Sequence, residues 1–207
     1  MSATACYLKM AIRAASDQLK EMGREVNVSD LEDIVMTHAC SAAISAAVAG
    51  SVTGVGALVA TGVGLGFVVA MYIRLGAAMG ITCSKGLIRA VASAILAELA
   101  AEVAVILAGT AAISFIPFVG NLSAGMLTAI ANFCLVYLAA VIFMKMLAAM
   151  LGKGVDPSSA SEAQLKANAR TAMAGTDMKA ACKEARNAYD TAQKNGDMKK
   201  PSVKPED

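Results

Sequence analysis

A long uncharged stretch in the second half of the chain constrains the fold more than any other feature. No side chain in residues 103–144 carries a formal charge. As one continuous helix the stretch would measure about 60 Å, roughly twice the thickness of a bilayer core, so it is too long for one crossing. Pro117 and Gly120 lie near its middle, where proline interrupts helical hydrogen bonding and glycine allows a turn. The stretch therefore predicts an apolar helical hairpin with its break at these residues.

A second uncharged stretch, residues 34–73, has the same organisation. A glycine-rich segment containing Gly50, Gly54 and Gly56 divides it into two arms of about 16 residues each. The first arm is rich in Ala, Ser and Val and is short for a membrane span. A buried bundle helix and a shallow membrane insertion are therefore alternative interpretations of this arm. Together the two stretches form an internal repeat of two apolar hairpins.

Three further glycines predict close helix packing. Gly62 and Gly66 are four residues apart in the second arm of the first hairpin, and Gly125 lies in the corresponding arm of the second. Small residues at such spacing let a neighbouring helix backbone approach closely. We expect these glycine faces to mediate self-association, which predicts a homo-oligomer.

Basic residues lie at the open ends of both hairpins, whereas both tips are uncharged. Arg74, Lys85, Arg89 and Lys145 would gather at one membrane surface. The positive-inside rule assigns that surface, with both termini, to the cytosolic side of a cytoplasmic membrane. The same pattern fits a soluble bundle whose loops are apolar because they are buried, and this alternative stays open.

The segment before the hairpins is more polar. Residues 3–25 place apolar and charged side chains at helical spacing, which predicts an amphipathic helix. Such a helix lies on a membrane surface or packs back on its own domain. Ser29 and Glu32 form a capping-box signature, so the next helix is expected to begin near Asp30.

The segment after the hairpins predicts a soluble, charged helical tail with a disordered end. Its helices are expected to break at residues 175–177, with Asp177 capping the second one. The sequence thus divides into an N-terminal amphipathic helix (residues 1–28), a hydrophobic helical-hairpin domain (residues 29–153) and the charged tail (residues 154–207). The predicted fold class is all-α.

Catalytic interpretations have little support. His38, the only histidine, fits a neutral, hydrogen-bonded helix-end residue better than a proton relay or a metal ligand. Glu98 and Glu102 are four residues apart, a spacing typical of a solvated helix face. The glycine-rich segments lack the third glycine of a dinucleotide loop, and no phosphate-binding loop motif occurs. We therefore predict no enzyme activity, no cofactor and no metal site.

Cysteine content and charge exclude two further classes of function. The five cysteines are widely spaced, which predicts free reduced thiols and argues against a disulfide framework or a zinc site. A net charge of +2, without a basic stripe, argues against a nucleic-acid partner.

Three motifs resemble a known family when they are taken in order. They are Ile34-Val35-Met36-Thr37-His38-Ala39, Met71-Tyr72-Ile73-Arg74-Leu75 and Phe115-Ile116-Pro117-Phe118-Val119-Gly120-Asn121. This order resembles the YcjF-like, GTPase-associated bacterial domain of unknown function. The resemblance implies a hydrophobic, membrane-associated helical region, and it supplies no catalytic residues. No GTPase domain precedes the hairpins here, so a GTPase partner would act in trans. The family often has a proline in the first break, where this chain has Ser51-Val52-Thr53-Gly54.

The sequence therefore predicts a non-enzymatic helical protein that contacts membrane lipid, anchors or self-associates there, and recruits a cytosolic partner through its charged tail. A pore-forming or toxin-like protein that inserts its apolar hairpins from a soluble bundle is the alternative. A small-solute channel is a third, weaker interpretation, because the arms carry only scattered polar groups.

Overall fold

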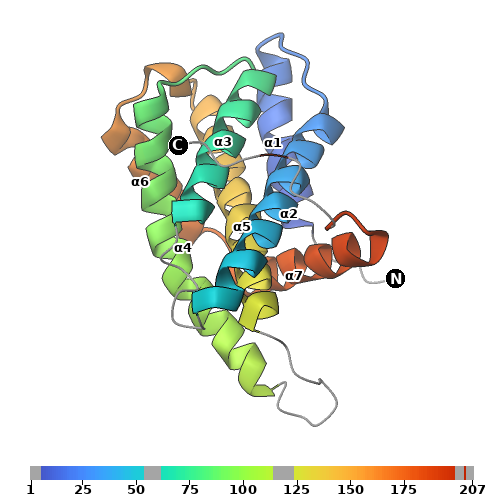
Figure 1. The fold of residues 1–207 in the computed structure, drawn as a ribbon. Coiled ribbons are helices and arrows are strands. Elements are labelled where there is room, and N and C mark those ends of the chain that lie inside the picture. Colours follow the sequence, from blue (N-terminus) through green and yellow to red (C-terminus); the bar gives the residue numbers. More distant parts are fainter. Residues whose placement is uncertain (1–5, 54–61, 114–123, 199–202, 204–207) are drawn as a thin grey trace.

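The computed structural model describes residues 6–53, 62–113, 124–198 and 203. Within these ranges the chain is entirely helical and contains no strand, so the predicted all-α class is confirmed (Figure 1). The α-helices are α1 (Tyr7–Glu21), α2 (Val28–Thr53), α3 (Gly62–Ala78), α4 (Lys85–Ile113), α5 (Ala124–Leu151), α6 (Glu162–Ala174) and α7 (Met178–Asn195), with a short 3-10 helix at Pro157–Ser159.

Helix α5 lies at the centre of the bundle. Every other α-helix contacts it, and α2 and α1 do so most extensively. Helices α2, α3, α4 and α5 run along the long axis, whereas α7 lies across one side (Figure 1). The core is therefore built around one helix.

The start of α2 differs from the sequence prediction. The helix begins at Val28, and the side-chain oxygen of Asn27 accepts a hydrogen bond from the Ser29 N–H at 3.0 Å. Asn27 thus supplies the cap that was assigned to Ser29, because asparagine is an equally strong N-cap residue and stands two positions earlier. Glu32, the expected capping-box partner, instead forms an ion pair with Lys9 of α1 at 3.6 Å.

The break between α6 and α7 agrees with the sequence prediction. The side chain of Asp177 accepts a hydrogen bond from the backbone N–H of Ala180 at 3.0 Å and caps α7. Ser161 and Gln164 form a reciprocal capping box at the start of α6. Local capping chemistry therefore explains where both helices of the tail begin.

The end of α3 requires a glycine. Gly80 has a φ of 67°, and the N–H of Ile81 donates to the carbonyl of Gly76 at 2.8 Å. This arrangement is a Schellman motif, which satisfies carbonyl groups that a helix end leaves open. A guanidinium nitrogen of Arg24 donates to the Gly80 carbonyl at 3.2 Å, so the connection after α1 is joined to the connection after α3.

Specific contacts fix α3 against α5. The rings of Tyr72 and Phe143 stack with centroids 4.0 Å apart, and the Tyr72 hydroxyl donates to the Ala139 carbonyl at 2.8 Å. Gly64 also approaches α5 closely, because an added Cβ would lie 3.3 Å from the side-chain oxygen of Asn132. These contacts hold α3 at one rotation about its axis.

Candidate functional site

Helix α5 is the most apolar and most enclosed element of the structure. Every residue from 128 to 144 is buried. Its few polar side chains have partners: the Asn132 amide donates to the Thr128 carbonyl at 3.0 Å, and the Tyr137 hydroxyl donates to Glu184 at 2.7 Å. A helix that is apolar on all sides belongs in a protein core or in lipid, and here protein covers it.

Helices α1, α6 and α7 cover α5 with one apolar face each. Helix α1 buries Leu8, Ile12 and Leu19 and exposes charged side chains on its other side. The buried residues of α6 are Leu165, Ala169, Ala172 and Met173, and those of α7 are Ala181, Cys182, Ala185, Tyr189 and Ala192. We call these three helices the cover of α5. They place charged groups toward water, whereas residues 124–144 of α5 carry none.

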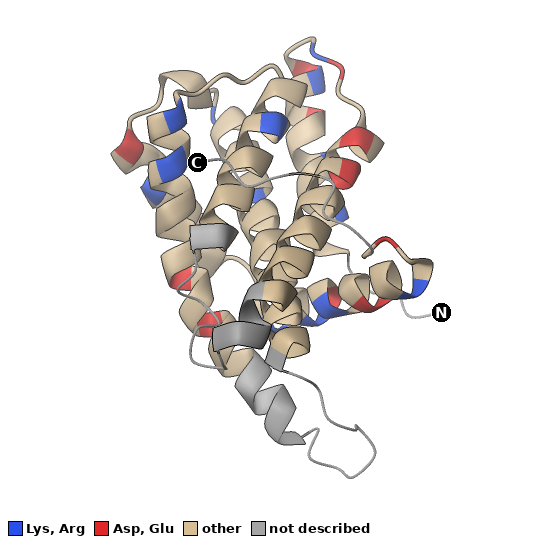
Figure 2. Cartoon of the chain, in the orientation of Figure 1, with Lys and Arg blue, Asp and Glu red and all other residues tan. Residues whose placement is uncertain are grey.

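Charge is segregated along the bundle. Figure 2 shows charged residues at the end where α3 meets α4 and along α7, whereas the described parts of α2, α3 and α5 toward the opposite end carry none. We call this opposite end the uncharged end. Val48 of α2 is 70% exposed there, and Val105 in the second half of α4 is 72% exposed. Large exposed apolar side chains mark a surface suited to an apolar environment. The exposed Glu102, one turn before Val105 on α4, borders this surface.

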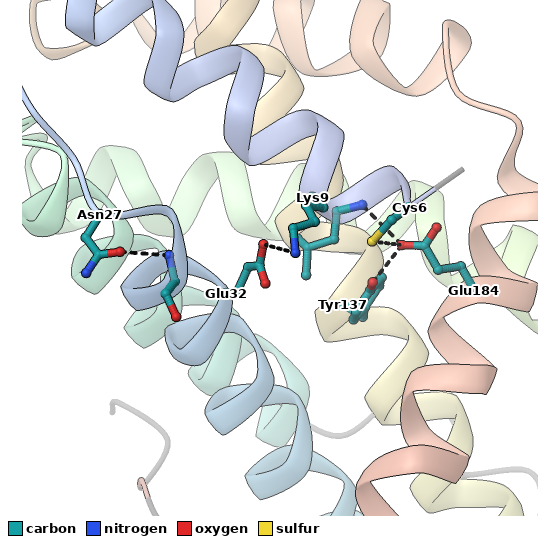
Figure 3. Close-up of polar contacts among 8 residues, drawn as sticks. Cys6, Lys9, Asn27, Glu32, Tyr137 and Glu184 are labelled. Atoms are coloured by element: carbon teal, nitrogen blue, oxygen red, sulfur yellow. Dashed lines mark hydrogen bonds and ion pairs between the residues drawn. The ribbon is translucent and has the colours of Figure 1, made fainter. Parts of the chain in front are cut away.

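A carboxylate on α7 joins the cover to α5 (Figure 3). Glu184 accepts hydrogen bonds from the backbone N–H groups of Tyr7 at 2.6 Å and Leu8 at 3.2 Å, at the start of α1. The same carboxylate accepts the hydroxyl of Tyr137 from α5 at 2.7 Å and, more weakly, the thiol of Cys6 at 3.6 Å. Negative charge at a helix N-terminus is favourable, so Glu184 stabilises the joint position of three helices.

Lys145 also joins α5 to the cover. Its ammonium group donates to the Gly175 carbonyl at 2.7 Å and to the Thr176 hydroxyl at 2.6 Å, both in the turn between α6 and α7. Lys145 was expected to be a basic residue at a membrane surface. In this structure it is half-buried and bound to protein.

The other basic residues of that predicted group are more accessible. Arg74, Lys85 and Arg89 are exposed, at the end of α3 and the start of α4. They therefore lie at the charged end of the bundle, together with the connection that joins these two helices.

The predicted glycine sites are only partly described. Gly50 lies inside α2, which continues to Thr53, whereas Gly54, Gly56, Pro117 and Gly120 fall outside the described residues. Gly62 is the first residue of α3, and Gly66 and Gly125 are buried within the chain.

His38 lies inside α2 and is fully buried. Its Nδ1 is 2.6 Å from the Ile34 carbonyl, so this nitrogen donates when the ring is neutral. Burial lowers the pKa of His38, and nearby Arg74 contributes to the lowering, although the hydrogen bond to Ile34 opposes it. A neutral, hydrogen-bonded histidine follows from these contacts.

Glu98 does not act as one of a carboxylate pair. It forms an ion pair with Arg170 of α6 at 2.9 Å, while Glu102 is exposed one turn further along α4. Among the described residues no group of three or more His, Cys, Asp or Glu side chains is placed to hold a metal ion. The features that stand out are thus apolar surface and helix packing.

Two described helices are long and apolar enough to cross a membrane, judged by length and composition. They are Val28–Val48 and Gly125–Leu151. The second coincides with α5, which is also the core helix of the bundle. Length and composition alone fit both roles.

No protein-family model matches this chain, and neither a curated protein nor a solved structure is similar to it at a significant level. The resemblance to the YcjF-like domain stays a prediction from sequence motifs. The candidate site is therefore defined by geometry: the buried helix α5, its cover, and the uncharged end.

Sequence reasoning missed two residues of this site. Glu184 lies in a charged stretch of α7 and looks like an ordinary surface residue in the sequence. Its partners Tyr7 and Tyr137 are 177 and 47 positions away, so no local pattern indicates them. The second is Gly64: helical spacing favours Gly62 and Gly66 and does not specify which glycine faces α5.

Proposed function

We propose that this chain is a non-enzymatic, membrane-inserting helical bundle. While the protein is in water, its most apolar helix, α5, is buried in the bundle. At a membrane α5 moves into lipid, after the uncharged end has bound the membrane surface. The observation that carries the proposal is the enclosure of the uncharged residues 128–144 of α5 by the other helices, three of which, α1, α6 and α7, are charged on their outer side. This is the alternative among the sequence predictions, and the burial of α5 favours it over a hairpin that is always in lipid.

The dimensions of α5 suit this role. Its uncharged part, residues 124–144, would span about 30 Å as a helix, which equals the thickness of a bilayer core. Lys145 follows directly and would reach the interface once its bonds to the α6–α7 turn are released. The length of the uncharged part and the position of this lysine are thus consistent with one crossing.

Insertion would proceed in two steps. The uncharged end docks first, because Val48 and Val105 gain by leaving water. The cover then separates from α5, which requires the bonds of Glu184 and Lys145 to break. Lipid replaces the cover around α5, and the charged outer faces of α1, α6 and α7 stay in water.

Vesicle experiments test the docking step. Full-length protein is floated with vesicles of phosphatidylcholine, with and without phosphatidylglycerol, and release of a trapped dye is recorded. Val105→Glu is expected to reduce binding at least several-fold, because a charge would have to enter the apolar region. Ser93→Glu is the matched control, since Ser93 is exposed on the same helix nearer its charged end. Equal binding by both variants would show that the uncharged end is not the docking surface.

A stable anchor that recruits a cytosolic partner is the second candidate. It is favoured by the exposed charges of the cover, including Arg170, Lys179 and Lys183. In this arrangement a GTPase acting in trans is one such partner, and the location is the cytoplasmic membrane with the termini in the cytosol. Tight vesicle binding without dye release would select this candidate over insertion.

The structure changes how recruitment is best tested. Deleting residues 156–207 would uncover α5, so a lost interaction would have two explanations. Charge reversal at Lys179 and Lys183 leaves the buried face of α7 intact, because both residues are exposed. If a pull-down retains its partners with this double variant, recruitment through that face of α7 is wrong.

A further inference from the structure

The only histidine of the chain lies inside the bundle with one ring nitrogen unpaired. His38 of α2 is 0% exposed, and its Nδ1 donates to the Ile34 carbonyl at 2.6 Å. Its Nε2 is buried and has no hydrogen-bond partner among the described residues. In the neutral ring Nε2 carries a lone pair, whereas protonation places an N–H and a positive charge there. The site therefore suits neutral His38, and the described residues offer no acceptor for its protonated form.

The charged groups around α2 do not compensate a charge on His38. Helices α5, α3 and α1 pack against α2. Arg74 is the one charged residue of α3, and its positive charge disfavours a second one on His38. Residues 124–144 of α5 carry no charge. Lys9 of α1 forms an ion pair with Glu32, which lies about 120° around α2 from His38. The nearest charge that acts on His38 is thus of the wrong sign.

The other titratable groups near α2 are exposed, bound elsewhere or uncharged. Asp33 is exposed, and Asp197, after α7, acts on Cys40, which lies about 160° around α2 from His38. Lys145 of α5 binds the turn between α6 and α7. Three further groups on the packed helices carry no charge between pH 5 and 7, namely those of Tyr72, Cys134 and Tyr137. Within this pH range His38 is therefore the group whose charge changes in the α2 interface.

Opening of the bundle would change the surroundings of this imidazole. When α5 leaves, α2 loses its most extensive contact. His38 is five residues after the exposed Asp33, about 8 Å along the helix, so water reaches it once the neighbouring helices separate. Burial, followed by Arg74, holds the pKa of His38 below 6.5 in the closed protein, although the hydrogen bond to Ile34 opposes this. The open form thus binds a proton more tightly than the closed form, and falling pH favours opening.

We propose that protonation of His38 is the trigger that opens the bundle for membrane insertion at mildly acidic pH. This inference rests on the proposed function, because it concerns the release of α5 to lipid. At neutral pH the uncharged imidazole fits among the packed helices, and α5 stays covered. As pH falls, the cation has water in the open form and no acceptor in the closed one.

The size of the effect follows from the ordinary pKa of histidine. An imidazole with a pKa of about 6.5 in the open form favours opening by about 11-fold at pH 5.5 and by about 1.1-fold at pH 7.5, when the closed form stays neutral. The opening equilibrium should therefore increase by up to about tenfold between these two pH values. Partial protonation of the closed form reduces the increase to several-fold.

Proton NMR tests the closed state without lipid. Because His38 is the only histidine, the signal of its Cε1 proton reports its titration in the full-length protein. The midpoint is expected below 6.5, and Arg74→Gln should raise it by removing the like charge. Arg89→Gln is the matched control, an exposed arginine at the same end of the bundle that should leave the midpoint unchanged. A midpoint of 6.5 or higher in the parent protein would overturn the trigger.

Amide exchange without lipid tests the opening itself. After correction for the intrinsic effect of pH on exchange, the amides of α5 in the parent protein should exchange several-fold faster at pH 5.5 than at pH 7.5. His38→Gln should remove most of this difference, because its side chain does not titrate. Arg74→Gln leaves the core intact and should shift the onset of faster exchange to higher pH. Equal acceleration in the parent and in His38→Gln would contradict the assignment to His38.

Dye release separates the trigger from the proposed function. Phosphatidylcholine vesicles are used, and the ratio of release rates at pH 5.5 and pH 7.5 cancels any change in basal rate. The ratio should be several-fold in the parent and close to 1 in His38→Gln. If the parent neither binds nor permeabilises vesicles at either pH, the membrane function is wrong, while amide exchange still decides whether His38 opens the bundle. If exchange depends on His38 but the release ratio does not, the role in insertion is overturned.

Discussion

Replacing Glu184 with alanine is expected to loosen α7 and the start of α1 together. The carboxylate accepts hydrogen bonds from the N–H groups of Tyr7 and Leu8 and from the hydroxyl of Tyr137. Alanine removes all three at once. Because these bonds connect the cover to α5, the variant tests whether the cover is held by specific polar contacts in addition to apolar burial.

The loss of stability depends on which hydrogen-bond partner each donor has once the carboxylate is removed. Tyr137 is 3% exposed, so its hydroxyl loses its carboxylate partner away from water, at a cost of about 1–3 kcal/mol. The N–H groups of Tyr7 and Leu8 lie at a partly exposed helix start, where water replaces part of the loss. Removing negative charge from that helix start costs about 0.5 kcal/mol more. The total is about 3 kcal/mol, which corresponds to a fall in Tm of roughly 6–12 °C for a chain of this size.

Thermal unfolding followed by circular dichroism measures this effect. Lys183→Ala is the control, because Lys183 is the exposed neighbour on α7 and its loss should change stability by less than about 0.5 kcal/mol. Tyr137→Phe removes the hydroxyl that donates to Glu184. The Glu184→Ala/Tyr137→Phe double variant therefore leaves no buried hydroxyl without a partner, and its loss of stability should be smaller than the sum of the two single losses. If Glu184→Ala has the same Tm as Lys183→Ala, the assigned contacts do not hold the cover. The same conclusion follows if the stability losses of Glu184→Ala and Tyr137→Phe simply add in the double variant.

Lower pH is expected to destabilise the protein through His38, whose pKa burial holds below 6.5. The contribution of neutral His38 to the free energy of unfolding is complete above about pH 6.5 and is lost as pH falls through the lowered pKa. On going to about pH 5.5, His38→Gln should therefore lose less of its free energy of unfolding, measured in urea, than the parent protein. An equal loss in both proteins would contradict this. Gly76→Ala should cost about 1–3 kcal/mol, because its Cβ would lie 2.7 Å from the Ile81 carbonyl oxygen, whereas Gly86→Ala meets no atom within 4 Å and should be tolerated. Lys145→Met should speed amide exchange in the turn between α6 and α7 by removing both of its hydrogen bonds, and unchanged exchange there would refute its bridging role.

The sequence predicts the helices better than it predicts what surrounds them. The uncharged residues 103–144 correctly indicate apolar helix, because every position of α5 from 128 to 144 is buried. Protein and lipid select the same apolar side chains, so the sequence of α5 does not distinguish the two environments. The choice depends on the helices that pack around α5, among which α1 and α2 lie far away in the chain.

Local chemistry was predictable where the partners are close in sequence. Asp177 caps α7 as expected, because an N-cap bonds to a backbone group three residues away. The cap of α2 was misplaced by two residues, since Asn27 and Ser29 are both good caps and the sequence does not rank them. The contacts of Glu184 and Gly64 are long-range, and only the packed structure reveals them.

The late position of α5 in the sequence determines when the core can form during synthesis of the chain. Helices α1 and α2 have α5 as their principal neighbour, yet α2 ends at Thr53 and α5 ends at Leu151. A ribosome adds about 5–20 residues per second, so these roughly 100 residues take on the order of 5–20 s to appear. During that interval α1 and α2 have been synthesised but their central partner α5 is not yet complete. The nascent chain therefore exposes the apolar faces of α1 and α2 to its surroundings before α5 is available to cover them.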